Sequence, residues 1–354
     1  MNDFLSDNAS GLCPEALEAL RGASGGYQVG YGADEETGRA VGLFRELFGG
    51  GTEVFFVATG TAANILALAS VTRPWERVLC EEYSHVASDE STGPERVTGC
   101  RVVTVAAEGR KLSPGDLERR DRGLPRGVHH PAPGAVSISN PTEFGEVYDP
   151  DELAALAEAS HRLGYRLHVD GARLANAVAR LGCAPRALAG DAGVDVLTFG
   201  GTKNGLALGE AVLFLPGPEA KEAAARFEYH RKGTGHLLSK HRFVSAPFAA
   251  VLEDGAWLRH AARANALAGR LAGGLTAAGM APRFATEANG VFVPLPEPVR
   301  RGLAERGWAF HSPGHPDWGV ARFMTSFDTA EARVDQLVRD AADSRAGAAG
   351  GAAT

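Results

Sequence analysis

The stretch that most constrains the fold of this chain is residues 166–203. It contains two short apolar segments, RLHV at 166–169 and VDVLTF at 194–199, with a helical pattern between them. Two buried strands joined by a helix form a parallel βαβ unit, because parallel strands need a crossover connection. The sequence therefore predicts an α/β fold built on a mainly parallel sheet.

Asp170 and Lys203 follow these two predicted strands. In an open parallel sheet the ligand crevice lies beyond the carboxyl ends of the strands, so a carboxylate and an amine would face one crevice. Pyridoxal 5'-phosphate (PLP) needs both, because a lysine carries it as a Schiff base and an acid keeps its ring nitrogen protonated. Either residue alone would be an ordinary surface or strand-end residue, but the pair favours a PLP site.

The motifs HVDGAR (168–173) and FGGTKNG (199–205) resemble the low-specificity L-threonine aldolases, which are fold-type I PLP enzymes of the aspartate-aminotransferase superfamily. The resemblance covers nearly the whole chain. It implies a mainly parallel seven-stranded sheet and a smaller C-terminal α+β domain. It also implies an aldehyde-lyase activity that cleaves L-threonine, L-allo-threonine and other β-hydroxy-α-amino acids to glycine and an aldehyde.

A glycine turn at the start of a predicted helix indicates an anion site. The segment ATGTAAN (58–64) follows a predicted strand at 53–58, and free N–H groups and the helix dipole at such a terminus attract anions. Many α/β folds have such a turn, but the resemblance implies that Gly60 and Thr61 bind the cofactor phosphate.

The resemblance also assigns the residues that would hold the substrate. Ser6, in the SDN segment, would contact the substrate carboxylate, and Tyr31, in the motif YG-x-D, would contribute to substrate binding. Arg173 can hold a carboxylate in a bidentate fork and would do so close to the cofactor ring. Arg322, in ARFMTSFDT, would reach the same carboxylate.

Two histidines are expected to take part in catalysis. His85 follows a predicted strand at 78–80 and matches the family histidine that stacks on the cofactor ring. His129 precedes a predicted strand at 135–139 and matches a histidine that contacts the substrate hydroxyl, although His130 replaces the usual aromatic residue. The proton of the β-hydroxyl would go to one of these histidines or to a water that they hold.

The basic segment 226–242 predicts how the chain assembles. In the family a basic side chain of this segment enters the phosphate site of the neighbouring subunit, and Lys232 aligns with it, although Gly233-Thr234 replaces the usual Gln-Ala. We therefore expect a homo-oligomer, a dimer with shared sites that forms a homotetramer as a dimer of dimers.

Composition excludes several other classes of protein. The net charge of −7 shows no basic excess, which argues against a nucleic-acid partner. No apolar run approaches the ~18 residues of a membrane span, and the first residues do not form a secretory signal. The four cysteines form no CxxC pair and no metal-ligand cluster is recognisable, so we expect a cytoplasmic enzyme with no membrane partner and no metal.

The length of 354 residues predicts more than one domain. The expected division is a large PLP-binding domain at 1–250, which includes the N-terminal substrate-contacting segment, and a small C-terminal domain at 251–343. The low-complexity sequence at 344–354 predicts a disordered tail.

Two alternative functions remain at this point. The first is a related PLP lyase, either a phenylserine-type aldolase or a β-eliminating lyase, which activity assays over different leaving groups would separate. The second is a non-catalytic binding or regulatory relative of the fold. The presence of Lys203, Asp170, Arg173 and Arg322 argues against that second reading.

Overall fold

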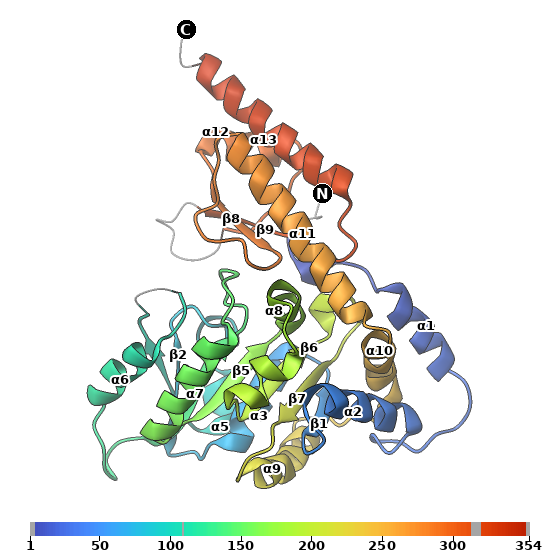
Figure 1. Ribbon diagram of the computed structural model, residues 1–354, viewed down its shortest axis with the longest axis vertical. Helices are drawn as coiled ribbons and strands as arrows, with labels where there is room; N and C mark the ends of the chain where they lie inside the picture. Colours follow the sequence, from blue (N-terminus) through green and yellow to red (C-terminus); the bar gives the residue numbers. More distant parts are fainter. Residues whose placement is uncertain (1–3, 108–109, 313–319, 352–354) are drawn as a thin grey trace.

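The computed structural model describes residues 4–107, 110–312 and 320–351. It has a large α/β unit and a smaller unit, which the long helix α11 (Ala256–Ala277) joins (Figure 1). The central sheet has seven strands in the order β1-β7-β6-β5-β4-β2-β3. These strands are β1 (Glu53–Val57), β2 (Glu76–Glu81), β3 (Arg101–Val105), β4 (Ala132–Ser139), β5 (Arg166–Gly171), β6 (Val196–Gly200) and β7 (Glu210–Phe214).

Most of this sheet is parallel, as predicted. Strands β2 to β6 pair in parallel, and β7 is antiparallel to both β1 and β6. The βαβ unit expected at 166–203 is confirmed as β5, α8 (Leu174–Leu181) and β6. The carboxyl ends of β2, β4, β5 and β6 consequently lie along one edge of the sheet.

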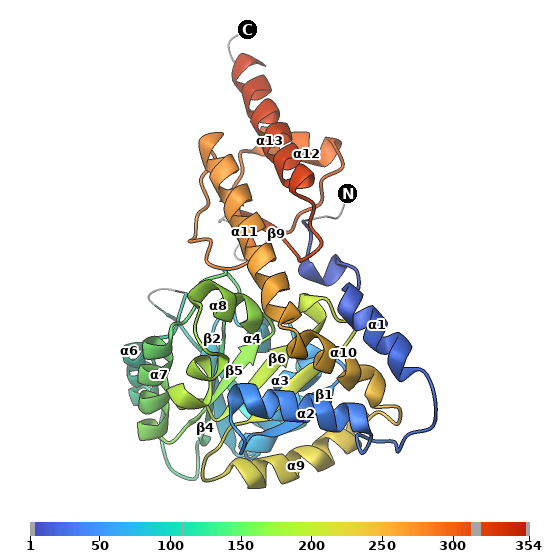
Figure 2. The same ribbon diagram turned by 45° about the vertical axis from the view of Figure 1, so that its right-hand side comes forward.

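Helices cover both faces of the sheet (Figure 2). One face carries α3 (Gly60–Val71), α5 (Gly93–Thr98) and α9 (Ala220–Gly233). The other carries α2 (Glu35–Phe48), α6 (Pro114–Arg122), α7 (Pro150–Leu163), α8 and α10 (Arg242–Glu253), with α1 (Pro14–Ala23) packed outside α10. Side chains alternate along a strand, so Val169 of β5 joins the core on this second face while Asp170 meets α3.

Local sequence sets the start of several helices. In α7 the Asp149 side chain accepts from the Glu152 N–H at 2.8 Å, and the Glu152 carboxylate accepts from the Asp149 N–H at 2.9 Å. This reciprocal capping box satisfies two N–H groups that the helix leaves without partners. The short helix α4 (His85–Ser88) begins directly at a predicted site residue.

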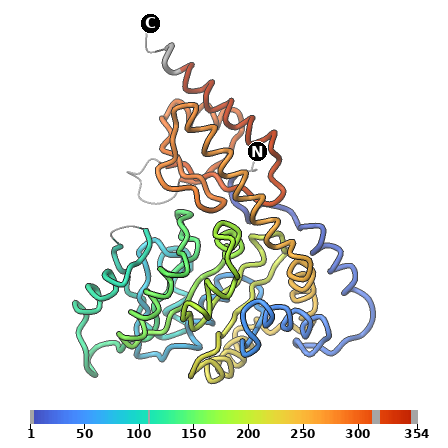
Figure 3. Tube along the Cα trace, in the orientation of Figure 1, coloured from blue at the N-terminus to red at the C-terminus, as the bar shows by residue number. Residues whose placement is uncertain are grey.

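The smaller unit has its own apolar core. Helices α11, α12 (Glu297–Glu305) and α13 (Glu331–Gly351) pack with an antiparallel pair, β8 (Gly290–Pro294) and β9 (Val320–Met324). Phe4 lies fully buried in this core, with its ring 5.7 Å from that of Trp308. The N-terminal segment therefore lies beside the small unit before it runs down to α1 (Figure 3).

The disorder expected for the tail at 344–354 stays a prediction, although a helix runs through the described part of this segment. Helix α13 continues through 344–351 to Gly351, and 352–354 lie outside the described residues. Alanine has the highest helix propensity, so the alanine-rich sequence extends a helix that the core already holds. The predicted division at 250/251 falls inside α10 and stays a prediction, because α11 places Trp257 in the large core and Leu271 in the small one.

Among the described residues, no helix combines the length and the apolarity needed to cross a lipid bilayer.

Candidate active site

Two adjoining cavities open at the carboxyl edge of the sheet. The inner one has a volume of about 340 Å³ and the outer one about 770 Å³. His85, Asp170 and Lys203 line both of them. The structure therefore brings together the three residues on which the predicted cofactor site depends.

The lysine lies in a turn that only glycine can build. Lys203 belongs to the 3-10 turn η4 (Thr202–Asn204), directly after β6. A Cβ atom on Gly200 would lie 2.1 Å from the Ala172 carbonyl oxygen, and one on Gly201 would lie 2.6 Å from the Gly209 carbonyl oxygen. Such distances exclude any side chain, so the two glycines let the backbone bring Lys203 to the crevice.

The lysine amine lies among fixed charges. The positive charge of Arg173, followed by burial, holds the pKa of Lys203 below its ordinary value, and Asp170 and Glu210 oppose this shift. Burial raises the pKa of Glu210 to about 7, and its carboxylate accepts from the Gly201 N–H at 3.0 Å. A lowered lysine pKa increases the fraction of neutral amine, the form that attacks a carbonyl carbon.

Asp170 is held as a carboxylate. Its oxygens accept from the Asn64 side-chain amide at 2.7 Å and from the Ala172 N–H at 2.9 Å. Burial alone would raise the pKa of Asp170, but the charge of Lys203 and these two hydrogen bonds hold it below its ordinary value. His168 lies two residues before Asp170 in β5 and is fully buried. Burial lowers the pKa of His168 to about 4, so its ring is neutral at neutral pH.

A chain of hydrogen bonds connects Asp170 with His85. The Asn64 amide also donates to Glu90 at 2.9 Å, and Glu90 lies 2.8 Å from Nδ1 of His85. The hydrogen bond to Glu90 raises the pKa of His85, although burial acts against it. The backbone N–H of His85 donates to Glu143 at 2.8 Å, so both the ring and the backbone of His85 are fixed.

The inner cavity is lined by the glycine turn that the sequence predicted to be an anion site. Gly60 and Thr61 begin α3 and line the cavity with Thr59. The Thr59 hydroxyl caps the helix by accepting from the Ala62 N–H at 3.2 Å. The first N–H groups of α3 therefore point toward the cavity, where they can bind phosphate oxygens.

Two guanidinium groups line the outer cavity, together with the acidic side chains of Asp89, Glu143 and Asp170. Arg173 forms a bidentate pair with Asp7, with distances of 2.6 and 2.8 Å. Arg322 lines the same cavity beside Ser6, and its Nε atom is buried with no hydrogen-bond partner. Both guanidinium groups line this cavity, where such charged donors can bind the carboxylate of a ligand.

These residues fit PLP. The α3 N-terminus suits its phosphate, the depressed pKa of Asp170 suits its protonated ring nitrogen, and Lys203 suits its aldehyde carbon. All three lie around one cavity whose size is that of a small cofactor.

Tyr31 and Lys232 lie together, away from these cavities. The Lys232 ammonium lies 4.8 Å from the centroid of the Tyr31 ring, and both residues are exposed. Neither of them lines the cavities of its own chain. A role in substrate or phosphate binding would therefore require the site of a neighbouring subunit.

The structure does not bring His129 to the site within one chain. His129 is exposed and lies just before the amino end of β4, whereas the cavities lie at the carboxyl ends of the strands. It lines neither cavity in the described part of the chain. The motif placed His129 near β4 but did not fix which end of the strand carries the site.

Sequence reasoning missed several residues that support the site. They are Asp7 on Arg173, Asn64 and Glu90 in the chain to His85, Glu143 under His85, and Glu210 near Lys203. Asp7 and Asn64 lie within the motifs SDN and ATGTAAN, which also contain the predicted site residues Ser6, Gly60 and Thr61. Their place as polar residues in these motifs could have indicated a role in the site. Glu210 follows Lys203 by seven positions with no pattern to mark it.

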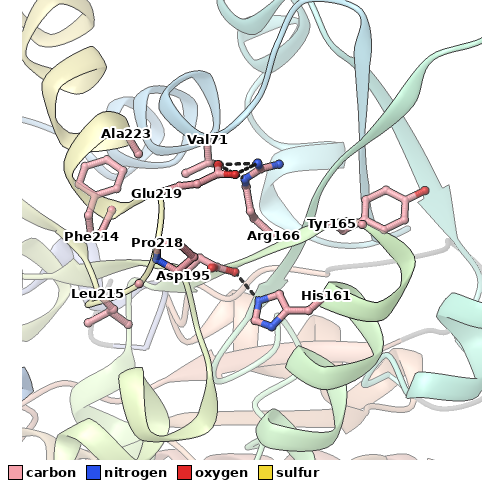
Figure 4. A pocket seen from close by; sticks show the side chains of 13 residues that line it. Val71, His161, Tyr165, Arg166, Asp195, Phe214, Leu215, Pro218, Glu219 and Ala223 are labelled. Atoms are coloured by element: carbon pink, nitrogen blue, oxygen red, sulfur yellow. Dashed lines mark hydrogen bonds and ion pairs between the residues drawn. The ribbon is translucent and has the colours of Figure 1, made fainter. Parts of the chain in front are cut away.

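A further hollow of about 400 Å³ lies at the opposite edge of the sheet (Figure 4). Its charged groups pair with each other, His161 with Asp195 at 2.8 Å and Arg166 with Glu219. None of the predicted site residues lines it. We therefore place the active site at the carboxyl edge.

The fold and the site define a fold-type I PLP-dependent enzyme. The profile of the family described as Beta-eliminating lyase matches residues 3–297. The chain is 48% identical over 341 residues to a low specificity L-threonine aldolase of Pseudomonas sp., covering 95% of this chain and 96% of that protein. It is 47% identical to the Pseudomonas aeruginosa protein of the same description, with the same coverage.

Solved structures agree with this result. A threonine aldolase of Leishmania major superposes with a TM-score of 0.89 at 27% identity, covering 96% of this chain and 98% of that one. An aspartate aminotransferase of Thermus thermophilus, at 18% identity and a TM-score of 0.67, shares the fold over 97% of this chain and 92% of that one. This chain belongs to the beta-eliminating lyase family, together with the low-specificity L-threonine aldolases.

Proposed function

We propose that this enzyme cleaves L-threonine, L-allo-threonine and other β-hydroxy-α-amino acids to glycine and an aldehyde. The observation that carries the proposal is the combination of a PLP site at Lys203 with the two guanidinium groups of Arg173 and Arg322 beside it. One end of this crevice suits a cofactor and the other suits the carboxylate of an amino acid. When bound, PLP supplies the electron sink for the Cα–Cβ bond that breaks.

The residues of the outer cavity would orient the substrate. Arg322 offers an unpaired donor to the substrate carboxylate, and Ser6 lines the same cavity. Arg173 would support this contact while Asp7 keeps its guanidinium in place. With the carboxylate fixed at this end, the β-carbon can be held on the side of His85, which lines the same cavity.

His85 is our candidate for the group that takes the β-hydroxyl proton. Its Nδ1 is engaged with Glu90, so Nε2 is the nitrogen available to a substrate. Glu90 stabilises the imidazolium that would form, because it carries a carboxylate 2.8 Å from the ring. His129 could act only if another subunit or a rearrangement brought it to the site.

We also propose that the active form is a dimer with shared sites, completed to a homotetramer. The support is the exposed pair of Tyr31 and Lys232, which faces neither cavity of its own chain. We further propose a cytoplasmic location, which is supported by four cysteines that form no disulfide in the structure.

The test is product release from a panel of amino acids. Purified enzyme with PLP is incubated with L-threonine, L-allo-threonine, L-phenylserine and L-serine O-esters, and glycine, aldehyde and pyruvate are measured. Glycine and aldehyde in equal amounts support the aldolase. Pyruvate and ammonia without glycine would identify a β-eliminating lyase instead.

A further inference from the structure

Three side chains of the kinds that bind metal ions meet between α1 and α11, away from the cavities described above. The Cys13 sulfur, a Glu15 carboxylate oxygen and a His260 ring nitrogen all lie within 4.8 Å of one another. His260 is 245 residues from Glu15 in the sequence. The cluster was therefore not recognisable in the sequence, because its members are brought together only by the fold.

The spacing of the three groups is close to that of zinc ligands. Nε2 of His260 lies 3.1 Å from a Glu15 oxygen, and two such ligands of a tetrahedral zinc lie roughly 3.3 Å apart. A thiolate on the same ion lies roughly 3.6 Å from each of them. The three ligand atoms lie no more than 4.8 Å from one another. Side-chain rotation would therefore have to shorten these distances by about an ångström at most to reach the zinc geometry.

A cation bound by the cluster would have to displace the proton of Cys13. Cys13 is fully buried, and burial raises the pKa of its thiol to about 11, so it is not a nucleophile near neutral pH. A bound divalent ion would displace its proton and would also neutralise Glu15. Arg259, 3.8 Å from the other Glu15 oxygen, is the nearby charge that opposes binding.

We propose that Cys13, Glu15 and His260 form a binding site for Zn²⁺. A thiolate, an imidazole and a carboxylate are all zinc ligands, and the thiolate discriminates against Mg²⁺ and Ca²⁺. A water molecule would complete the tetrahedron.

The site would act on the turn that carries the active-site lysine. The Cys13 N–H donates to the Gly205 carbonyl at 2.8 Å, and the Asn204 amide donates to the Trp257 carbonyl in α11 at 2.8 Å. An ion that joins Cys13 to His260 would therefore connect α1 and α11 around the end of this turn. We assign it a structural role, with an expected gain in thermal stability.

The experiment is a calorimetric titration of Zn²⁺ into the purified holoenzyme. We expect one ion per chain, with an affinity that rises with pH because binding releases the thiol proton. Cys13→Ser, Glu15→Gln and His260→Ala should each weaken binding by more than the ~10–100-fold typical of residues that only support a ligand. Co²⁺ should show visible bands of a tetrahedral thiolate complex, at longer wavelength than the cofactor.

Two variants serve as matched controls. His161→Ala removes a histidine that pairs with a carboxylate at 2.8 Å elsewhere, and Cys183→Ser removes a half-buried thiol; both should bind Zn²⁺ as the wild type does. Circular dichroism identifies any variant that fails to fold, and Glu15→Gln, with a half-buried side chain, provides a test that does not depend on the buried cysteine. The proposal fails if the folded ligand variants and the controls bind Zn²⁺ alike.

Discussion

Lys203 lies in a cavity between Asp170 and the start of α3, and its amine is the group that would hold the cofactor. Lys203→Ala should abolish covalent attachment of PLP and nearly all activity, because no other lysine lines the cavity in the described structure. Borohydride reduction followed by mass spectrometry measures the attachment. Lys221→Ala, an exposed lysine on α9, should change neither quantity, and cofactor trapped in the Lys203 variant at another position would contradict the assignment.

The pair of Glu90 and His85 predicts a pH dependence. The hydrogen bond to Glu90 raises the pKa of His85 above its ordinary value of 6.5. His85 must be neutral to act as a base, so it becomes active only at a pH above that ordinary value. Activity should therefore rise with pH through this raised pKa. Glu90→Gln removes the charge that stabilises the imidazolium, so the acid limb of the kcat/KM profile should move to lower pH. An unmoved limb would remove His85 from the role of base.

Arg322 tests the recognition of the substrate carboxylate. Arg322→Ala should raise KM for amino acids roughly ten- to a hundredfold, because hydrogen bonds to charged groups contribute about 1.5–3 kcal/mol. The absorption of bound PLP should stay unchanged. Arg301→Ala, whose side chain is 69% exposed on α12, is the control, and equal KM values for both variants would place Arg322 outside the site.

At this scale the sequence predicted residues that a strand end or a helix start positions locally. Lys203, Asp170, Gly60 and Thr61 are of this kind. Contacts across long stretches of chain could not be predicted in the same way, as the 166 residues between Asp7 and Arg173 show. The role of His129 stays a prediction, because a motif beside a strand does not state which end of that strand faces the site, and His129 lines neither cavity of its own chain.

At the scale of elements, the short turn η1 (Asp7–Ala9) is attached to the large unit through one buried ion pair. The charge and hydrogen bonds of Arg173 outweigh burial and lower the pKa of Asp7 from 3.8 to about 2. An acid with a depressed pKa adds stability above its unfolded pKa and loses it as the pH falls. The stability of the enzyme from this pair should thus decline between pH 3.8 and about 2.

Asp7→Asn should destabilise the protein by about 3–5 kcal/mol at neutral pH, because it leaves Arg173 as an uncompensated buried charge. Chemical denaturation in the presence of PLP measures the free energy of unfolding. The control is Asp191→Asn, which breaks an exposed pair with Arg186 of 2.8 Å and should cost less than about 1 kcal/mol. Similar losses for the two variants would show that the Asp7 pair does not hold η1.

Elements with strong local signals were predicted well, and those that depend on context were not. The strand expected at 53–58 and the helix expected to begin at the glycine turn after it are observed as β1 (Glu53–Val57) and α3 (Gly60–Val71). The tail from 344 depends on such context: its low complexity suggested disorder, whereas α13 continues to Gly351 after earlier turns that pack in the small core, as Val334 and Ala341 do.

At the scale of the whole molecule, the exposed pair of Lys232 and Tyr31 predicts an active site that needs two chains. Lys232→Ala should weaken PLP affinity and loosen the dimer, and both losses should grow at low protein concentration. Sedimentation with and without PLP measures the assembly, and Lys240→Ala, an exposed lysine of the same segment, is the matched control. A fully active monomer, or unchanged PLP affinity at every concentration, would refute the shared site.

The order in which the chain is synthesised gives the burial of Phe4 a further consequence. Phe4 packs against residues of α11 to α13, and its carbonyl accepts from the Met324 N–H at 2.9 Å. A ribosome adds ~5–20 residues per second, so Phe4 emerges many seconds before β9 exists. The segment around Phe4, although synthesised before the small unit, cannot take its native place until β9 has emerged. Ser6 and Asp7 lie two and three residues after Phe4, so the substrate end of the site forms last.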